Sequence, residues 1–117
     1  MIVGVGVDLV DLTRFERKLT ETAGLSEKIF TATEREANAQ SLAGFWAAKE
    51  SVIKAIGNPQ GLAWHDIEIT KDELGKPKLN ITGATKNRAD EMGITSWHLS
   101  ISHDGGMATA FVIAEGN

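Results

Sequence analysis

The segment from Ile2 to Val10 combines two glycines with one carboxylate in a pattern that could form a ligand site. Gly4, Gly6 and Asp8 alternate along this valine-rich segment, so in a strand they share one face with Ile2. Glycine inside a strand weakens it and often marks a close approach of backbone or of a ligand. One interpretation is a ligand beside the Asp8 carboxylate. The other is that a neighbouring element packs on the glycines and Asp8 caps the next helix.

A second candidate group lies in the alanine-rich segment 42–56, which is predicted to be the main helix and to end at residues 57–59, Gly-Asn-Pro. Glu50 and Lys54 are four residues apart and therefore share one side of this helix. Such a pair commonly does no more than stabilise an exposed helical surface. Lys49 projects toward the edge of the apolar side, so it either snorkels to solvent or reaches a ligand.

His103 is a third candidate because it ends a segment of regular alternation. Trp97, Leu99 and Ile101 share one face of the segment 96–103, and His103 has the same parity at its end. A histidine in this position is either a satisfied core residue or a group that points into a cleft at the sheet edge. The sequence leaves both interpretations open.

The elements that must position these groups follow from hydrophobic periodicity and turn residues. The expected strands are residues 2–10, 65–70, 78–82, 96–103 and 107–114. The first expected helix is capped by Asp11 or Thr13 and ends near Leu19. Three further helices are expected at residues 33–39, 42–56 and 84–92. This order predicts an α+β fold with a mainly antiparallel sheet, helices packed on one side, and the segment 107–114 as a covered central strand. Residues 1–117 are expected to form a single domain.

The composition excludes several classes of protein. The chain has 117 residues, of which 42% are hydrophobic, as expected for a folded globular domain. It has no cysteine, which excludes disulfides, thiolate metal sites and cysteine nucleophiles and fits a cytoplasmic location. A net charge of −4 argues against nucleic acid as a partner. The N-terminal segment does not resemble a signal peptide, and no apolar run is long enough to span a membrane.

Five strings in this order and spacing resemble bacterial holo-[acyl-carrier-protein] synthase, the small stand-alone class of 4′-phosphopantetheinyl transferases. They are GVDLVDLTRF, FTATERE, WAAKESVIKAIG, DELGKPKL and LSISHDGGMATAFVIAE, and together they cover nearly the whole chain. The resemblance implies the 4′-phosphopantetheinyl transferase fold and a homotrimer with each active site between two protomers. It also implies transfer of 4′-phosphopantetheine from coenzyme A to a serine of an apo acyl carrier protein, in support of fatty acid biosynthesis.

The resemblance assigns the chemistry to three residues. Asp8 and Glu50 match the family's Mg²⁺ ligands, and Lys54 matches a lysine that contacts phosphates or assists proton transfer. Mg²⁺ is a hard cation whose usual site is one or two carboxylates plus substrate phosphate oxygens. It neutralises charge on the transferring phosphoryl group, and Lys54 adds positive charge where negative charge develops. Glu50 is the first candidate for the base that accepts the serine proton, and Lys54 is the second.

The resemblance, together with the position of Lys49 on its helix and the charged side of the first helix, predicts two sets of binding residues. The expected coenzyme A contacts are Lys49, Lys54, Gly75, Lys76, Pro77 and His103. The expected docking face for the carrier protein is basic and lies on the first helix, at Arg14, Arg17 and Lys18. Acyl carrier proteins are acidic, and this chain also has a negative net charge. It therefore needs such a local positive face to bind a carrier protein.

Two features depart from the family. Phe45 stands where relatives commonly carry arginine, and if that arginine holds a phosphate, Lys49 or another residue must replace it. The stretch of nine residues between Glu36 and Trp46 is shorter than usual, which affects any contact that it makes with coenzyme A.

Three alternative functions remain. The partner is either a free carrier protein or a carrier domain of a large multifunctional synthase, and the sequence does not distinguish them. A non-catalytic, metal-dependent nucleotide-binding module would use the same residues without transfer. A purely structural trimeric subunit would not bind coenzyme A at all.

Overall fold

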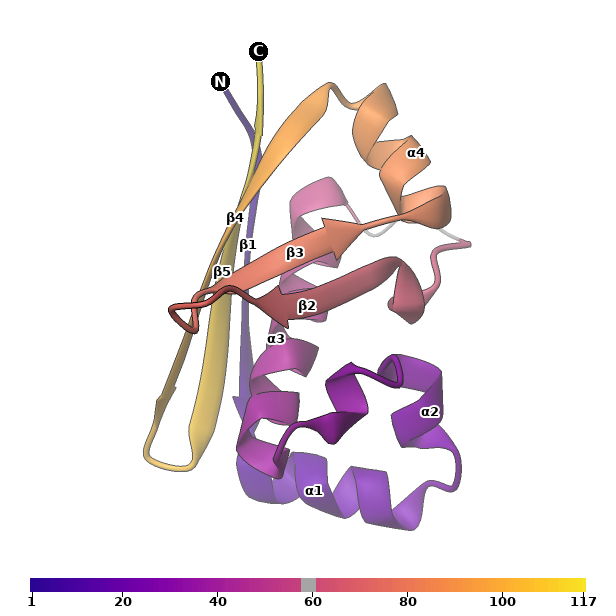
Figure 1. Cartoon of the computed structure of the whole chain (residues 1–117), viewed down its shortest axis with the longest axis vertical. Coiled ribbons are helices and arrows are strands. Elements are labelled where there is room, and N and C mark those ends of the chain that lie inside the picture. Colours follow the sequence, from indigo (N-terminus) through magenta and orange to yellow (C-terminus); the bar gives the residue numbers. More distant parts are fainter. Residues whose placement is uncertain (58–60) are drawn as a thin grey trace.

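The computed structural model describes residues 1–57 and 61–117, so Asn58 and Pro59 of the predicted helix stop lie outside the described residues. The elements in chain order are β1 (Ile2–Asp11), α1 (Leu12–Glu21), α2 (Leu25–Ile29), η1 (Glu34–Glu36), α3 (Ala39–Ile56), η2 (Trp64–Asp66), β2 (Ile67–Lys71), β3 (Pro77–Ile81), α4 (Gly83–Glu91), β4 (Ile94–Asp104) and β5 (Met107–Gly116) (Figure 1). The α+β class and all five strands agree with the sequence prediction.

The strands form two antiparallel sheets rather than one. β1, β5 and β4 form a three-stranded sheet in that order, so β5 is the central strand, as predicted for residues 107–114. β2 and β3 form a separate two-stranded sheet. The helices lie on one side of the three-stranded sheet, as expected from the sequence, and the β2–β3 pair lies on the same side (Figure 1).

Helix α3 packs directly on β1 because two glycines allow it to. A Cβ atom added at Gly4 would collide with the Ala55 carbonyl oxygen, and one at Gly6 would collide with the Ser51 carbonyl oxygen. The packing interpretation of these glycines is therefore correct, although Asp11 and not Asp8 caps the next helix. The same close approach fixes which α3 side chains lie beside Asp8.

Ile2 does not share the face of the two glycines. A β-bulge between Ile2 and Gly4 shifts the register of β1 against β5. As a result, Ile2 is exposed and Val3 packs against the hydrophobic core. Sequence alternation alone does not reveal a bulge, because the extra residue changes which side chains point inward.

The outer face of the three-stranded sheet is apolar and exposed along β1 and the adjoining part of β5. Its exposed apolar side chains are Val5, Val7, Leu9 and Phe111, which are 52%, 55%, 63% and 44% exposed. The inner face of β5 is buried, but its outer face is not, so the expectation of a strand covered on both faces fails within the single chain. Among residues 1–57 and 61–117, no other element lies on this outer face (Figure 1).

The N-terminal region settles one open alternative and corrects one prediction. Asp11 caps α1, since its Oδ1 accepts a hydrogen bond from the Arg14 backbone N–H at 2.9 Å. The helix expected at residues 33–39 is only the short turn η1. Instead, the chain forms α2, which the sequence prediction missed, and this helix begins after Gly24 with φ +78° and buries Ile29. A helix of five residues offers too few turns for periodicity to be recognised.

None of the helices in the described part of the chain has both the length and the hydropathy needed to cross a bilayer.

Candidate functional site

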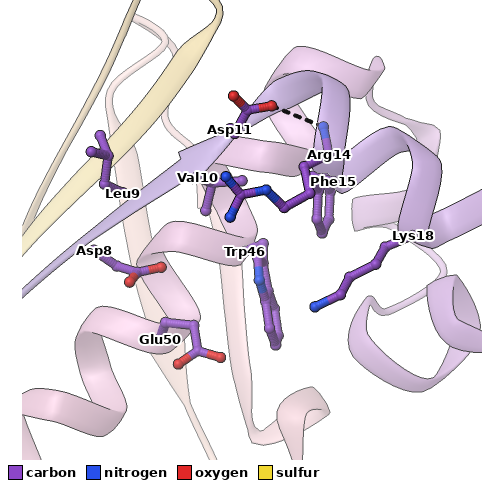
Figure 2. Close-up of a pocket in the computed structure, with 9 residues that line it drawn as sticks. All are labelled: Asp8, Leu9, Val10, Asp11, Arg14, Phe15, Lys18, Trp46 and Glu50. Atoms are coloured by element: carbon purple, nitrogen blue, oxygen red, sulfur yellow. Dashed lines mark hydrogen bonds between the residues drawn. The ribbon is translucent and has the colours of Figure 1, made fainter.

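A cavity of about 280 Å³ opens where β1, α1 and α3 meet, and it holds both candidate metal ligands. Its charged and aromatic lining comprises Asp8, Asp11, Arg14, Phe15, Lys18, Trp46 and Glu50. Figure 2 shows Asp8 on β1 and Glu50 on α3 beside one another, with Arg14 and Lys18 reaching in from α1. Two carboxylates and two basic side chains from three elements therefore face one hollow.

Lys54 lies next to Asp8 and fixes its position. The Lys54 ammonium donates hydrogen bonds to the Val7 carbonyl oxygen at 2.9 Å and to Asp8 Oδ1 at 3.2 Å. The Lys54 side chain is 54% exposed and the Asp8 side chain 19%, so the pair lies at the surface end of the carboxylate cluster. The predicted catalytic set of Asp8, Glu50 and Lys54 is thus brought together.

The environment of Glu50 suits a cation. Partial burial raises the pKa of Glu50 above its ordinary value, and the negative charge of Asp8 raises it further. Lys54 and Lys18 oppose this increase, but the net direction is upward. Two carboxylates that repel one another gain from a shared cation, so these residues fit a divalent metal ion.

Two carboxylates are enough protein ligands to bind Mg²⁺. Within residues 1–57 and 61–117, no cluster of three or more His, Cys, Asp or Glu side chains is placed to hold an ion. Mg²⁺ does not need such a cage, because it usually keeps several waters and binds one or two carboxylates together with substrate phosphates. The donor set of Asp8 and Glu50 is therefore typical of Mg²⁺.

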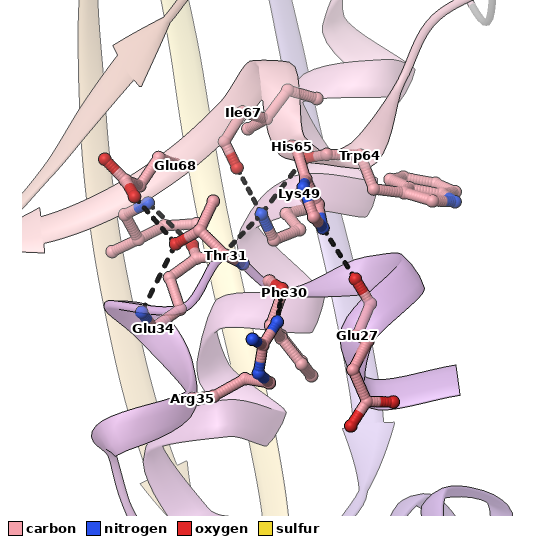
Figure 3. Close-up of polar contacts among 11 residues, drawn as sticks. Glu27, Phe30, Thr31, Glu34, Arg35, Lys49, Trp64, His65, Ile67 and Glu68 are labelled. Atoms are coloured by element: carbon pink, nitrogen blue, oxygen red, sulfur yellow. Dashed lines mark hydrogen bonds and ion pairs between the residues drawn. The ribbon is translucent and has the colours of Figure 1, made fainter. Parts of the chain in front are cut away.

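The structure contradicts the prediction that Lys49 contacts coenzyme A. Its side chain is fully buried, forms an ion pair with Glu34 Oε1 at 2.9 Å and donates to the carbonyl oxygens of Trp64, at 3.1 Å, and Ile67 (Figure 3). Burial lowers the pKa of Lys49, although the Glu34 carboxylate opposes the shift. The side chain has no path to solvent, so a ligand in either cavity cannot reach it.

Glu34 is the buried partner that sequence reasoning missed. Its carboxylate accepts hydrogen bonds from the backbone N–H groups of Thr31, at 2.9 Å, and Ile69, at 2.8 Å, in addition to the Lys49 ion pair. These contacts join η1, α3 and β2 (Figure 3). The only available signal was the position of Glu34 within the FTATERE string, one of the five matched to the family.

A second cavity, of about 120 Å³, holds several of the predicted coenzyme A contacts. Gly75 of the β2–β3 turn and Pro77, the first residue of β3, line it together with His103 near the end of β4. His103 is exposed, and its Nε2 donates to the Gln40 carbonyl oxygen at 3.0 Å, so the cleft interpretation is the right one. Lys76 does not line the cavity; its backbone N–H donates to Asp72 Oδ1 at 2.9 Å.

The basic residues of α1, Arg14, Arg17 and Lys18, are all exposed, whereas Phe15 of the same helix is buried. Arg14 and Lys18 line the first cavity, whereas Arg17 does not. The predicted docking face therefore adjoins the carboxylate cluster, so a partner bound to α1 lies next to Asp8 and Glu50.

The two cavities lie at opposite edges of the three-stranded sheet. The first is bounded by β1 and the second by β4, and β5 lies between these strands. Strands in a sheet are about 4.8 Å apart, so the two edges are separated by roughly 10 Å, with α3 between the cavities.

Comparisons with known proteins agree with one family. A model of the 4′-phosphopantetheinyl transferase superfamily matches residues 4–112. The holo-[acyl-carrier-protein] synthase of Clavibacter michiganensis subsp. michiganensis is 48% identical over 117 residues, covering 100% of this chain and 98% of the relative. The protein of the same name from Kocuria rhizophila is 50% identical over 115 residues, covering 98% of this chain and 94% of the relative.

Solved structures give the same result. The crystal structure of holo-ACP-synthase from Plasmodium yoelii superposes with a TM-score of 0.89 at 31% identity, covering 100% of this chain and 97% of that one. The Helicobacter pylori holo-[acyl-carrier-protein] synthase in complex with coenzyme A superposes with a TM-score of 0.82 at 31% identity, covering 95% and 99%.

Proposed function

The chain belongs to the 4′-phosphopantetheinyl transferase superfamily, as a member of its holo-[acyl-carrier-protein] synthase family, and on this premise we propose that it transfers 4′-phosphopantetheine from coenzyme A to a serine of an apo acyl carrier protein. The observation that carries the proposal is the cavity in which Asp8 and Glu50 meet beside Arg14 and Lys18. We assign this activity to residues 1–117 acting as one domain.

Asp8 and Glu50 are the residues that would hold Mg²⁺. They come from β1 and α3, two elements fixed against each other by the glycine contacts, so their separation does not depend on a flexible loop. When bound, the ion supplies charge neutralisation and orientation for the phosphoryl group that is transferred. The raised pKa of Glu50 supports this role, because it reflects crowding of negative charge that a cation relieves.

The reaction joins the serine oxygen to the β-phosphorus of coenzyme A and releases adenosine 3′,5′-bisphosphate. The serine proton must move to a base, and Glu50 is the better candidate of the two. Lys54 is already engaged as a hydrogen-bond donor to the Val7 carbonyl oxygen and to Asp8. Lys54 instead holds Asp8 in place and adds positive charge beside the reacting phosphates.

The carrier protein docks on α1 in this proposal. Arg14, Arg17 and Lys18 are exposed on that helix, and two of them reach the cavity that contains the carboxylates. An acidic partner attracted to this face would bring its serine toward Asp8 and Glu50. The partner is a free carrier protein of fatty acid biosynthesis, or alternatively a carrier domain of a large synthase.

Coenzyme A occupies the second cavity as well as the first. Gly75, Pro77 and His103 meet there, and Lys76 lies in the same turn with its side chain exposed. The related Helicobacter pylori enzyme was crystallised with coenzyme A, which supports this substrate. The absence of cysteine agrees with the cytoplasmic location that we propose for the enzyme.

The active form is a homotrimer with each site between two protomers. The apolar outer face of the sheet, with Val5, Val7, Leu9 and Phe111, is too exposed for a chain that stays alone in water. A site between protomers also explains why the two cavities lie at opposite edges of one sheet. The β1 edge of one protomer and the β4 edge of its neighbour would then form one substrate cleft.

A mass-shift assay tests the proposed function. Purified protein is mixed with apo acyl carrier protein, coenzyme A and Mg²⁺, and the carrier is expected to gain the mass of phosphopantetheine. Chelation of the metal should stop the gain. No transfer to a free carrier or to an excised synthase domain would contradict the proposal, and tight coenzyme A binding without transfer would favour a non-catalytic binding module.

A further inference from the structure

Lys18 of α1 lines the cavity that contains the two carboxylates and also the cavity next to it. This third cavity has a volume of about 250 Å³, and it shares Phe15, Lys18 and Trp46 with the first. Figure 2 shows the Lys18 side chain running from α1 with its ammonium beside Trp46. Arg17, the preceding residue of the helix, lines neither cavity. The two neighbours on α1 therefore face different surroundings.

The positive charge of Lys18 acts on the carboxylate pair. It opposes the rise in the pKa of Glu50, as the charge of Lys54 also does. Both Glu50 and Asp8 line the same cavity as Lys18. An anion held between the carboxylates and α1 would therefore lie in the field of the Lys18 ammonium.

Lys18 differs from Lys54 in that no carboxylate neutralises it. Among residues 1–57 and 61–117, no ion pair includes Lys18. The Lys54 ammonium, in contrast, already donates to the Val7 carbonyl oxygen at 2.9 Å and to Asp8 Oδ1 at 3.2 Å. Lys18 thus brings to the cavity a positive charge that is available to a substrate.

The anion that enters this cavity in the proposed reaction is the phosphoryl group that is transferred. As the serine oxygen bonds to the β-phosphorus, the bond from that phosphorus to the oxygen of adenosine 3′,5′-bisphosphate breaks. Negative charge is spread over the non-bridging oxygens at this stage. An ammonium directed at these oxygens stabilises the transition state. Carboxylates of the carrier protein would meet the exposed Arg17 instead, which lies outside the cavity.

We infer that Lys18 is a catalytic residue whose ammonium contacts a non-bridging oxygen of the transferred phosphoryl group. This role rests on the proposed function, since it assumes that phosphoryl transfer takes place beside Asp8 and Glu50. Lys18 keeps its proton throughout, because the serine proton goes to the base. The role goes beyond the attraction that the basic face of α1 exerts on an acidic carrier.

The test compares the unaltered chain with four variants. Lys18→Met removes the charge and keeps much of the length, and Lys18→Arg keeps the charge. Arg17→Met removes an exposed charge from the same helix and reports the effect of docking alone. Lys28→Met is the matched control, because Lys28 is an exposed lysine that lines the third cavity but not the first.

The rate and the binding of the carrier are measured separately by the carrier mass shift. Reactions contain Mg²⁺ and saturating coenzyme A, and the carrier concentration is varied at low and at high salt to give kcat and the KM for the carrier. Circular dichroism verifies that each variant is folded. A docking contact changes mainly KM and weakens as salt is added, whereas a contact made in the transition state changes kcat.

Lys18→Met should lower kcat by about tenfold at both salt concentrations, which is less than the loss for an enclosed donor because Lys18 is exposed. Lys18→Arg should keep most of the rate. Arg17→Met should raise the KM for the carrier at low salt, and Lys28→Met should leave kcat unchanged.

Two results would overturn the role of Lys18. In the first, Lys18→Met raises the KM for the carrier as Arg17→Met does but keeps the kcat of the unaltered chain, which would leave docking as its only role. In the second, Lys18→Arg or Lys28→Met loses as much rate as Lys18→Met, so the loss is not specific to a charge at this position.

Failure of the proposed function gives a different result. Absence of transfer by the unaltered chain would overturn the proposed function and the role of Lys18 with it. Normal transfer by the unaltered chain, with an unchanged kcat in Lys18→Met, would overturn the role of Lys18 alone.

Discussion

Lys54 Nζ lies 3.2 Å from Asp8 Oδ1, a contact between residues that are 46 positions apart in the chain. It forms because α3 rests on β1 at Gly4 and Gly6, where any side chain would push the helix away. The same packing aims Glu50 into the cavity that Asp8 lines. Two glycines in a strand thus set how closely the helix that carries Glu50 approaches the strand that carries Asp8, the two carboxylates proposed to be catalytic.

Two lysines of the same helix should respond to substitution in opposite ways. Lys49→Met breaks a fully buried ion pair and leaves Glu34 without its counter-charge, so it should lower the free energy of unfolding by about 3–5 kcal/mol. Lys54→Met breaks an exposed pair and should change stability by less than about 1 kcal/mol, yet it should slow transfer strongly. Denaturant unfolding and the carrier mass shift measure the two effects.

A double variant separates the ion pair from other effects of Lys49. Glu34→Gln with Lys49→Met removes both charges and should be more stable than Lys49→Met alone. If Lys49→Met instead has an unaltered free energy of unfolding and a raised KM for coenzyme A, the predicted contact between Lys49 and coenzyme A is correct after all.

Glu50→Gln should make the metal-free protein more stable while it stops transfer. The pKa of Glu50 is raised by burial and by Asp8, so the folded chain keeps a proton that the unfolded chain has released. Between the ordinary glutamate pKa of about 4.3 and the raised value, the free energy of unfolding therefore falls as pH rises. Glutamine carries no charge, so the free energy of unfolding of the variant should not decrease in this way as pH rises.

Thermal unfolding in chelator from pH 4 to pH 7 tests this prediction. The difference in Tm between Glu50→Gln and the unaltered chain should be small at pH 4 and should grow as pH rises. Glu91→Gln, at an exposed residue of α4, is the matched control and should show no such trend. If the Tm of Glu50→Gln at pH 7 is lower than that of the unaltered chain, the folded protein stabilises the ionised Glu50 carboxylate. That result would contradict the destabilisation by burial and by Asp8.

The sequence was sufficient for the order of the elements but not for the contacts between them. Alternation and helical spacing located the strands and α3, and the side of α1 that carries Arg14, Arg17 and Lys18 followed from periodicity. Lys49 shows where prediction from the sequence ends. A residue at the edge of the apolar side of a helix is exposed or buried depending on which other elements pack there, and helical spacing does not reveal those elements. Its partner Glu34 lies in a segment without periodicity, so no local pattern connected the two residues.

The division into two sheets was also beyond local patterns. Nothing in the alternation of residues 65–70 and 78–82 indicates that this hairpin pairs only with itself. Similarly, the meeting of Gly75, Pro77 and His103 depends on the tertiary arrangement. The family resemblance supplied the expectation that these three residues contact coenzyme A, but it did not predict the division into two sheets.

A charged residue on the outer face of the sheet should dissociate the proposed trimer. Val7→Glu and Leu9→Glu each place a carboxylate in the exposed apolar face, where burial against a neighbour would be costly. Light scattering should show monomers, with little change in circular dichroism and a loss of transfer. Leu74→Glu is the control, since Leu74 is 95% exposed outside this face. A variant that is monomeric and fully active would contradict a site between protomers.

Reversing the charge of Arg14 should weaken carrier binding more than coenzyme A binding. Arg14→Glu places a negative charge on the face proposed to meet an acidic protein, and we expect about a tenfold increase in the KM for the carrier at low salt. The difference from the unaltered chain should shrink as salt is added. Arg88→Glu, on α4 and away from both cavities, is the control. Equal losses for carrier and coenzyme A would argue against the docking face.

Transfer by Asp8→Ala and Glu50→Ala tests the central claim most directly. Each variant is incubated with apo carrier protein, coenzyme A and Mg²⁺, and the mass of the carrier is followed over time, with circular dichroism to verify folding. We predict that each folded variant transfers at least about a hundredfold more slowly than the unaltered chain. Transfer at the full rate by either variant would show that the two carboxylates do not form the reaction centre.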